Sequence, residues 1–302
     1  MKRKPSLILV VGGTGTQGGN VARELLKQEY RVKIVTRTPT SPSAKQLEQL
    51  GAELVKGDLS EPASLIPVMN DVKAIFSAQY ADPNDLSVEI RNTRNMVQAA
   101  KDAGVEQIVH TSVVETNIFP RWDKSEMLSK LWESKYLAEE LIREAGFPYW
   151  TILHPSFFME NFIDPLSGYM APELKQGKLF GVLYPHTPLK LNNGQDTSLF
   201  ARTAFENPDK FNTKDINIAS DELSMTQIAE IISKISGKTI TYEEVDAEEG
   251  IQRGLFMGTV ESHRWMNDVR GWGFDIKETY SYDIPLTPFE QWLTDNRSRI
   301  AK

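Results

Sequence analysis

The chain has 302 residues, 40% hydrophobic and 25% charged, as is usual for a globular protein. Its net charge of −7 argues against a nucleic-acid partner, and the lack of cysteine excludes disulfides, thiolate metal sites and a cysteine nucleophile. No apolar run approaches the about 20 residues that cross a bilayer, and no histidines stand at metal-ligand spacing, so we expect a cytoplasmic protein without a membrane span or a metal site.

Strands and helices are predicted to alternate through the first 155 residues. Short apolar runs indicate buried strands, and longer segments with helical spacing indicate helices between them. The predicted strands cover residues 7–11, 30–37, 52–60 in part, 72–78, 107–113 and 149–155. The predicted helices cover residues 17–28, 43–50, 61–69, 85–103 and 124–145. Such alternation is typical of an α/β protein with a doubly wound parallel sheet.

The alternating rhythm ends after Pro155, where proline, glycine and aromatic residues become frequent. We therefore predict an N-terminal nucleotide-binding domain over residues 1–155 and a smaller α+β domain over residues 156–302. The second domain is expected to cover the carboxyl edge of the sheet. The strand near 216–220 is expected to return to that sheet. Further elements are predicted at 224–237 (helix), 239–245 (strand) and 288–300 (helix).

A glycine-rich loop, GGTGTQG at residues 12–18, follows the first predicted strand and opens the first predicted helix. Gly12 permits a tight turn, Gly15 lets a phosphate approach the backbone, and Gly18 lets the helix pack close to the sheet. Free N–H groups at the start of the helix then face a pyrophosphate. Nucleotide binding is the prediction, and a purely structural turn is the alternative.

Arg37 ends the second predicted strand, 19 positions after Gly18. Sites that bind NAD carry an acidic residue about 20 positions beyond the glycines, where it binds the ribose 2′-hydroxyl. A guanidinium there would instead pair with a 2′-phosphate. The sequence therefore predicts NADP(H) in preference to NAD(H), with a solvated surface arginine as the alternative.

Two further strand ends carry candidate cofactor residues. Asp58 follows the third strand and either accepts a hydrogen bond from the adenine amino group or forms a turn before the next helix. Ala78, Gln79 and Tyr80 end the fourth strand and are expected to pass under the nicotinamide ribose. Tyr80 would stack or donate a proton there, or it is an ordinary loop tyrosine.

Lys135 and Ser112 are the candidate catalytic residues. In short-chain dehydrogenases a helix carries Tyr-x-x-x-Lys: the lysine binds the nicotinamide ribose, the tyrosine gives a proton, and a serine orients the substrate. Here Leu131 stands four residues before Lys135, and Tyr136 is rotated by about 100° around the helix. The half of this motif that binds the cofactor is therefore present, and the tyrosine that usually serves as the acid is missing. The alternative for Lys135 is a solvated lysine on the helix surface.

These features together resemble the NmrA-like family of atypical short-chain dehydrogenase/reductases, over about residues 6–300. The segments that carry the resemblance are VVGGTGTQGGNVARELL, VTR, GDLSEPASL, WESKYLAEELIREAGFPYWTILHP and FFMENF. The resemblance implies a Rossmann-type fold that prefers NADP(H), with a small C-terminal domain. It assigns cofactor contacts to Gly12, Thr14, Gly15, Thr16, Gln17, Gly18, Arg37, Asp58, Leu59, Gln79 and Lys135.

The same resemblance implies that the segment from Pro155 to Asn161, with Phe158, borders the nicotinamide. The family usually has arginine where this chain has His154, which is therefore either a neutral buried imidazole or a proton donor. Rings in PSFFMENF and LFGVLYPH would line an apolar substrate cleft or form the core of the second domain: Phe157, Phe158, Phe162, Phe180 and Tyr184.

Two functions fit this resemblance. One is an NADPH-dependent reductase of a flat, electron-poor substrate, such as a quinone, dye or conjugated carbonyl, that works without the tyrosine. The other is a redox sensor that binds NADP(H) and regulates a protein partner without chemistry. The resemblance allows a monomer or a homodimer, and the sequence favours the reductase because aromatic residues are available to line a cleft.

Overall fold

The computed structural model describes residues 5–80, 82, 85–117 and 125–300. Its chain separates into two compact units. The first unit comprises residues 1–121, 129–155 and 197–216, and the second comprises residues 122–128, 156–196 and 217–302. Among the described helices, none combines the length and apolar character that a membrane crossing requires.

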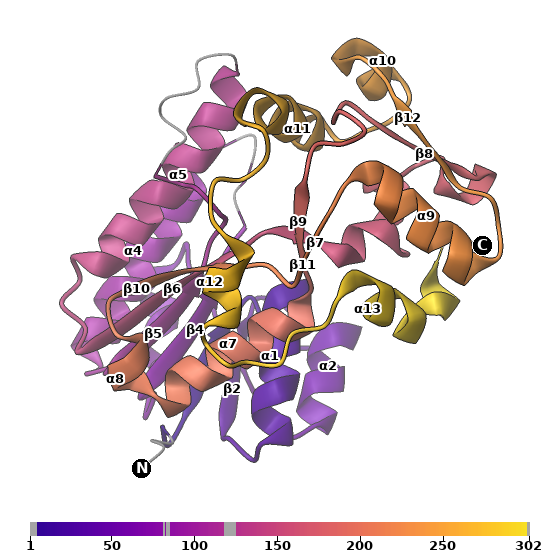
Figure 1. Ribbon diagram of the computed structural model, residues 1–302. Coiled ribbons are helices and arrows are strands. Elements are labelled where there is room, and N and C mark those ends of the chain that lie inside the picture. Colours follow the sequence, from indigo (N-terminus) through magenta and orange to yellow (C-terminus); the bar gives the residue numbers. More distant parts are fainter. Residues whose placement is uncertain (1–4, 81, 83–84, 118–124, 301–302) are drawn as a thin grey trace. The chain divides into compact units, whose positions relative to one another are not determined.

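A seven-stranded sheet in the order β10-β6-β5-β4-β1-β2-β3 forms the centre of the first unit (Figure 1). Each neighbouring pair from β3 to β6 runs parallel. The strands are β1 (Ile8–Val11), β2 (Val32–Thr36), β3 (Glu53–Lys56), β4 (Ala74–Ala78), β5 (Gln107–Thr111), β6 (Tyr149–Pro155) and β10 (Lys214–Ile218). This arrangement confirms the predicted doubly wound sheet.

The helices of the first unit cover both faces of this sheet. Figure 1 shows α1 and α2 on one face and α4 and α5 on the other. Their bounds are α1 (Thr16–Lys27), α2 (Pro42–Gln49), α3 (Pro62–Val68), α4 (Ser87–Asp102), α5 (Glu126–Arg143) and α8 (Pro208–Phe211). Because both faces are covered, the central strands are continuous apolar runs, and β1 is buried along its whole length.

The strand order reverses at β1, which pairs with β2 on one side and β4 on the other. In open α/β sheets, ligands bind outside the carboxyl ends of the strands at such a reversal. The loops that follow β1 and β4 therefore mark the expected binding edge of this unit.

The second unit contains two small sheets. Strand β9 (Leu189–Asn192) pairs with β7 (Phe157–Phe158) and β11 (Asp221–Leu223), and β8 (Lys178–Gly181) pairs with β12 (Thr241–Glu244). The remaining helices are α6 (Ser167–Met170), α7 (Gly194–Glu206), which crosses from this unit into the first, α9 (Met225–Ser236), α10 (Ala247–Gln252), α11 (Met257–Val269), α12 (Ile276–Tyr280) and α13 (Phe289–Asp295), with short 3₁₀ turns at Met159–Phe162, Leu174–Gln176 and Arg297–Arg299. The predicted helix at 224–237 is α9, which begins with a capping box between Ser224 and Gln227.

Candidate functional site

Several predicted site residues of the first unit lie where its strands end. Each of these stands at or within three residues of a carboxyl terminus in the parallel sheet, so the sheet brings them to one edge. They are Gly12 after β1, Arg37 after β2, Asp58 and Leu59 after β3, Ala78, Gln79 and Tyr80 at the end of β4, Ser112 after β5 and Pro155 at the end of β6.

The glycine loop turns tightly onto the neighbouring strand. Gly12 has a φ of +76°, and a Cβ there would lie 2.2 Å from the backbone oxygen of Ala78. A Cβ on Gly18 would lie 2.3 Å from the oxygen of Gly12. From the sequence we expected Gly18 to let the helix pack close to the sheet. In the structure it lets α1 pack against the glycine loop itself. Both glycines are required by the backbone's own packing.

The middle of the glycine loop, at Gly15, is less tightly packed than Gly12 and Gly18. A Cβ on Gly15 would meet only the Gly12 oxygen, at 3.4 Å. Thr14 and Thr16 are exposed on either side. No side chain caps the start of α1, and its first turn has no acidic residue. An anion that approached Gly15 would therefore meet the positive end of the helix.

Gln17 has a role in the fold that the sequence did not reveal. Its Oε1 accepts a hydrogen bond of 2.7 Å from Thr111, at the end of β5. This bond connects the first turn of α1 to β5, which is separated from β1 by β4 in the sheet. Thr111 is buried and carries no motif, so only the packed sheet identifies it.

Arg37 and Asp58 interact at the adenine end of the predicted site. Arg37 is exposed, and Asp58 is partly buried. The Ser60 backbone N–H is the main group that lowers the pKa of Asp58, and the Arg37 guanidinium adds to the effect. Asp58 Oδ1 accepts from the backbone N–H and the hydroxyl of Ser60, at 2.9 and 2.8 Å. Asp58 therefore forms a turn before α3, which is one of its two predicted roles, and the contact with adenine stays a prediction.

The three residues at the end of β4 differ in how strongly the surrounding structure fixes their side chains. Gln79 Nε2 donates to Thr93 on α4 at 2.9 Å, which fixes the side chain against that helix. Its Oε1 is buried and has no hydrogen-bond partner. Ala78 touches the Gly12 turn as described above, while Tyr80 is 75% exposed. Tyr80 therefore has the surroundings of a surface loop tyrosine.

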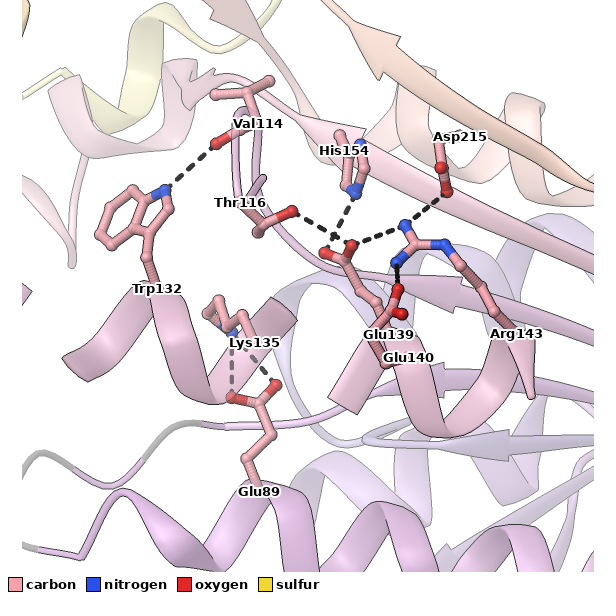
Figure 2. Close-up of polar contacts among 10 residues, drawn as sticks. All are labelled: Glu89, Val114, Thr116, Trp132, Lys135, Glu139, Glu140, Arg143, His154 and Asp215. Carbon is pink, nitrogen blue, oxygen red and sulfur yellow. Dashed lines mark hydrogen bonds and ion pairs between the residues drawn. The ribbon is translucent and has the colours of Figure 1, made fainter. Parts of the chain in front are cut away.

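Lys135 forms an ion pair instead of pointing freely into water. Its Nζ lies 3.2 and 3.4 Å from the two carboxylate oxygens of Glu89, in the first turn of α4 (Figure 2). The Glu89 side chain is fully buried and that of Lys135 is 17% exposed. This contact argues against the solvated-lysine alternative, and no motif in the sequence points to Glu89.

One turn beyond Lys135, the same helix carries Glu139 into a second buried cluster (Figure 2). Glu139 Oε1 lies 3.0 Å from His154 Nε2, and Oε2 accepts from Thr116 and from Arg143. Burial alone would raise the pKa of Glu139, but the hydrogen bond and charge of His154 lead the groups that lower it to about 2. His154 therefore belongs to a buried cluster of hydrogen-bonded and charged side chains.

Ser112 is the remaining candidate beside this cluster. Its backbone N–H donates to Leu153 on β6 at 2.8 Å, and its buried hydroxyl has no well-formed hydrogen bond. The hydroxyl still helps to lower the pKa of Glu139. Leu131 and Tyr136 are partly buried on α5, and neither offers a proton where a short-chain dehydrogenase has its tyrosine.

Phe158 and Asn161 lie in the second unit, at the end of β7 and in the following 3₁₀ turn. Phe162 and Phe180 are buried in that unit's core, whereas Tyr184 is 54% exposed. Phe157 and Phe158 are partly buried. The aromatic residues named from the sequence thus divide between core and surface, and the predicted nicotinamide contacts of Phe158 and Asn161 stay predictions. The sequence also predicts a loop near the cleft over residues 113–124, and residues 118–124 of it lie outside the described residues.

The first unit fits a nicotinamide dinucleotide on its own geometry. Gly15 leaves open space over an uncapped helix start, which suits a pyrophosphate. The exposed Arg37 guanidinium suits a phosphorylated ribose, and the Lys135 ammonium suits ribose hydroxyls. Among the described residues, no group of three His, Asp or Glu side chains is arranged to hold a metal ion.

The sheet order and the glycine loop at its reversal define a Rossmann-type α/β protein. The chain belongs to the NmrA-like family, whose model matches residues 4–278.

Known relatives include proteins of different kinds. An NmrA-like family domain-containing protein from Dictyostelium discoideum is 30% identical, over 95% of this chain and 96% of its own. An NAD(P)H azoreductase from Xenophilus azovorans is 26% identical, over 85% of this chain and 83% of its own. The solved structure of NmrA, a negative transcriptional regulator, in complex with NADP has a TM-score of 0.79 at 17% identity, covering 99% of this chain and 97% of that one. At that identity the structural match speaks for the fold.

Proposed function

We propose that this chain binds NADP(H) at the carboxyl edge of its sheet and reduces a flat, electron-poor substrate such as a quinone, an azo dye or a conjugated carbonyl. The observation that carries the proposal is the pairing of an open, uncapped helix start at Gly15 with an exposed guanidinium at Arg37. The first suits a diphosphate and the second a 2′-phosphate. The relationship to an NAD(P)H azoreductase supports the substrate class.

The bound nicotinamide would supply a hydride, and this chain's residues would hold and orient it. Lys135 would donate hydrogen bonds to the nicotinamide ribose, and the Ser112 hydroxyl, which also acts on Glu139, would orient the substrate. Leu131 replaces the usual acid, so the reaction relies on proximity and orientation, with water as the source of the proton. Such a site suits acceptors that need little acid assistance.

The test follows the loss of NADPH absorbance with a panel of quinones, azo dyes and conjugated carbonyls. We expect turnover with at least one acceptor, and tighter binding of NADPH than of NADH. Arg37→Glu should weaken NADPH binding by about tenfold or more while it changes NADH binding little, because a carboxylate repels the 2′-phosphate.

An unchanged NADPH affinity in Arg37→Glu would contradict the cofactor assignment. Retained NADPH binding without turnover on any acceptor would contradict the reductase and favour the redox sensor. Lys27→Glu serves as the control, because it makes the same change of charge on an exposed residue. Lys27 lies in the last turn of α1, at the end of the helix away from the glycine loop.

A further inference from the structure

The carboxylate of Glu89 lies in an unusual place for an acidic side chain. It is fully buried in the first turn of α4, and both of its oxygens face Lys135 Nζ. A buried carboxylate without a cation is strongly destabilising, so folding holds this one only together with the ammonium. The pair therefore fixes where the end of a long, flexible lysine side chain stands.

We propose that Glu89 is the positioning residue that presents Lys135 to the nicotinamide ribose. This inference rests on the proposed function, since it needs a dinucleotide at the carboxyl edge of the sheet. A lysine ammonium has three N–H donors. Glu89 takes one or two of them, and the Lys135 side chain is 17% exposed. The proposal gives the remaining donors to the ribose hydroxyls.

Glu89 lies on a helix that is attached to the glycine loop through the end of β4. Gly12 packs directly on Ala78, and the next residue, Gln79, donates to Thr93. Thr93 is fully buried and lies one helical turn after Glu89, on the same face of α4. The turn that would hold the diphosphate and the carboxylate that holds Lys135 are thus connected through the end of β4.

Under this proposal Glu89 affects only the nicotinamide end of the cofactor, where Lys135 would lie. Adenosine 2′,5′-bisphosphate contains the ribose phosphates expected near Arg37 and lacks the nicotinamide ribose expected near Lys135. A positioning residue for Lys135 should therefore affect NADPH and leave the bisphosphate alone. A residue needed only for folding should affect both.

The experiment measures the binding of NADPH and of adenosine 2′,5′-bisphosphate by titration calorimetry. The variants are Glu89→Gln, Lys135→Met, their double mutant and, as control, Glu133→Gln at an exposed position on α5. We expect Glu89→Gln and Lys135→Met each to weaken NADPH binding by about tenfold, and the double mutant to be no worse than Lys135→Met. Bisphosphate binding should change less than about twofold in every variant.

Several results would overturn the inference. Full NADPH affinity in Glu89→Gln, with a loss in Lys135→Met, would remove Glu89 and leave the proposed function standing. Equal losses of NADPH and bisphosphate would make Glu89 a folding residue. Losses that add in the double mutant would mean that Glu89 does not act through Lys135. Failure of the unaltered protein to bind either ligand would overturn the proposed function itself.

Glu89→Gln leaves a largely buried ammonium without its counter-charge, and Lys135→Met leaves a fully buried carboxylate without its cation, so the folding of both variants is checked by circular dichroism. If Glu89→Gln does not fold, Glu89→Asp replaces it. The aspartate keeps the charge and draws the carboxylate back by one methylene group. A smaller but selective loss of NADPH binding supports the inference, and unchanged NADPH binding overturns it.

Discussion

Gly12 and Gly15 stand three residues apart in one loop, yet a methyl group at each would meet different surroundings. At Gly12 it would strike the Ala78 backbone oxygen at 2.2 Å, in a left-handed conformation. At Gly15 it would touch only the Gly12 oxygen, at an ordinary contact distance of 3.4 Å, beside an extended backbone. The first glycine is explained by the fold, whereas the fold does not require the second, which the proposed cofactor would explain.

Alanine substitutions separate these two roles. Gly12→Ala should lower the free energy of unfolding by about 2 kcal/mol or more, because the backbone itself must move. Gly15→Ala should change it by less than about 0.5 kcal/mol. It should nonetheless weaken NADPH binding about tenfold or more, since the methyl group fills the approach to the backbone. Urea denaturation and ligand titration measure the two effects, and full NADPH affinity in Gly15→Ala would refute the phosphate role.

At the scale of a single element, α5 carries three charged residues at one-turn spacing: Lys135, Glu139 and Arg143. Their partners come from different elements, with Glu89 on α4, His154 on β6 and Asp215 on β10 (Figure 2). One face of the helix is thus attached to α4 and to the sheet through buried polar and charged contacts in place of a purely apolar stripe. This explains why charged residues recur on a face that the sequence would assign to solvent.

Removing the middle charge should be the most damaging change on this face. Glu139→Gln should lower the free energy of unfolding by about 3 kcal/mol, because it leaves Arg143 and His154 beside a neutral amide in a buried site. Glu140→Gln is the matched control. It breaks an ion pair with the same arginine at a half-exposed position and should lose less than about 1 kcal/mol. Equal losses in urea denaturation would contradict a special role for the buried cluster.

At the scale of the whole molecule, each unit buries a histidine that has no hydrogen-bond partner on its ring. Burial lowers the pKa of His110, in the first unit, to about 3 and that of His263, in the second, to about 4. An unfolded histidine titrates near 6.5. The folded state therefore binds fewer protons than the unfolded state between these values, and stability is lost as the pH falls below about 6.5.

Each buried histidine should lower the free energy of unfolding by about 2 kcal/mol between pH 7 and pH 5. Urea denaturation at intermediate pH values measures this slope. His263→Gln should make the slope of the second unit shallower, because glutamine takes up no proton. His186→Gln, at an exposed position, should leave the slope unchanged. Equal stability at pH 7 and pH 5 would contradict the argument.

The sequence predicted the sheet well because its strands are continuous apolar runs between helical segments. The glycine loop and Arg37 could also be located, since their spacing from the first strand is local information. Glu89 and Thr111 could not, because their partners Lys135 and Gln17 lie 46 and 94 residues away and no motif links them. The role of Asp58 could not be predicted from the sequence for another reason. An aspartate after a strand is equally suited to a turn with Ser60 and to a hydrogen bond with adenine.

Strand β10 has a consequence for how the chain acquires its fold during synthesis. It pairs with β6, and the segment before it also bonds to the first unit through Gln107 to Ala204 and Glu24 to Arg202. A ribosome must therefore deliver residues to about 218 before the main sheet has its last strand. Until then the nascent chain presents the bare edge of β6, a template for unwanted pairing that a chaperone would need to shield.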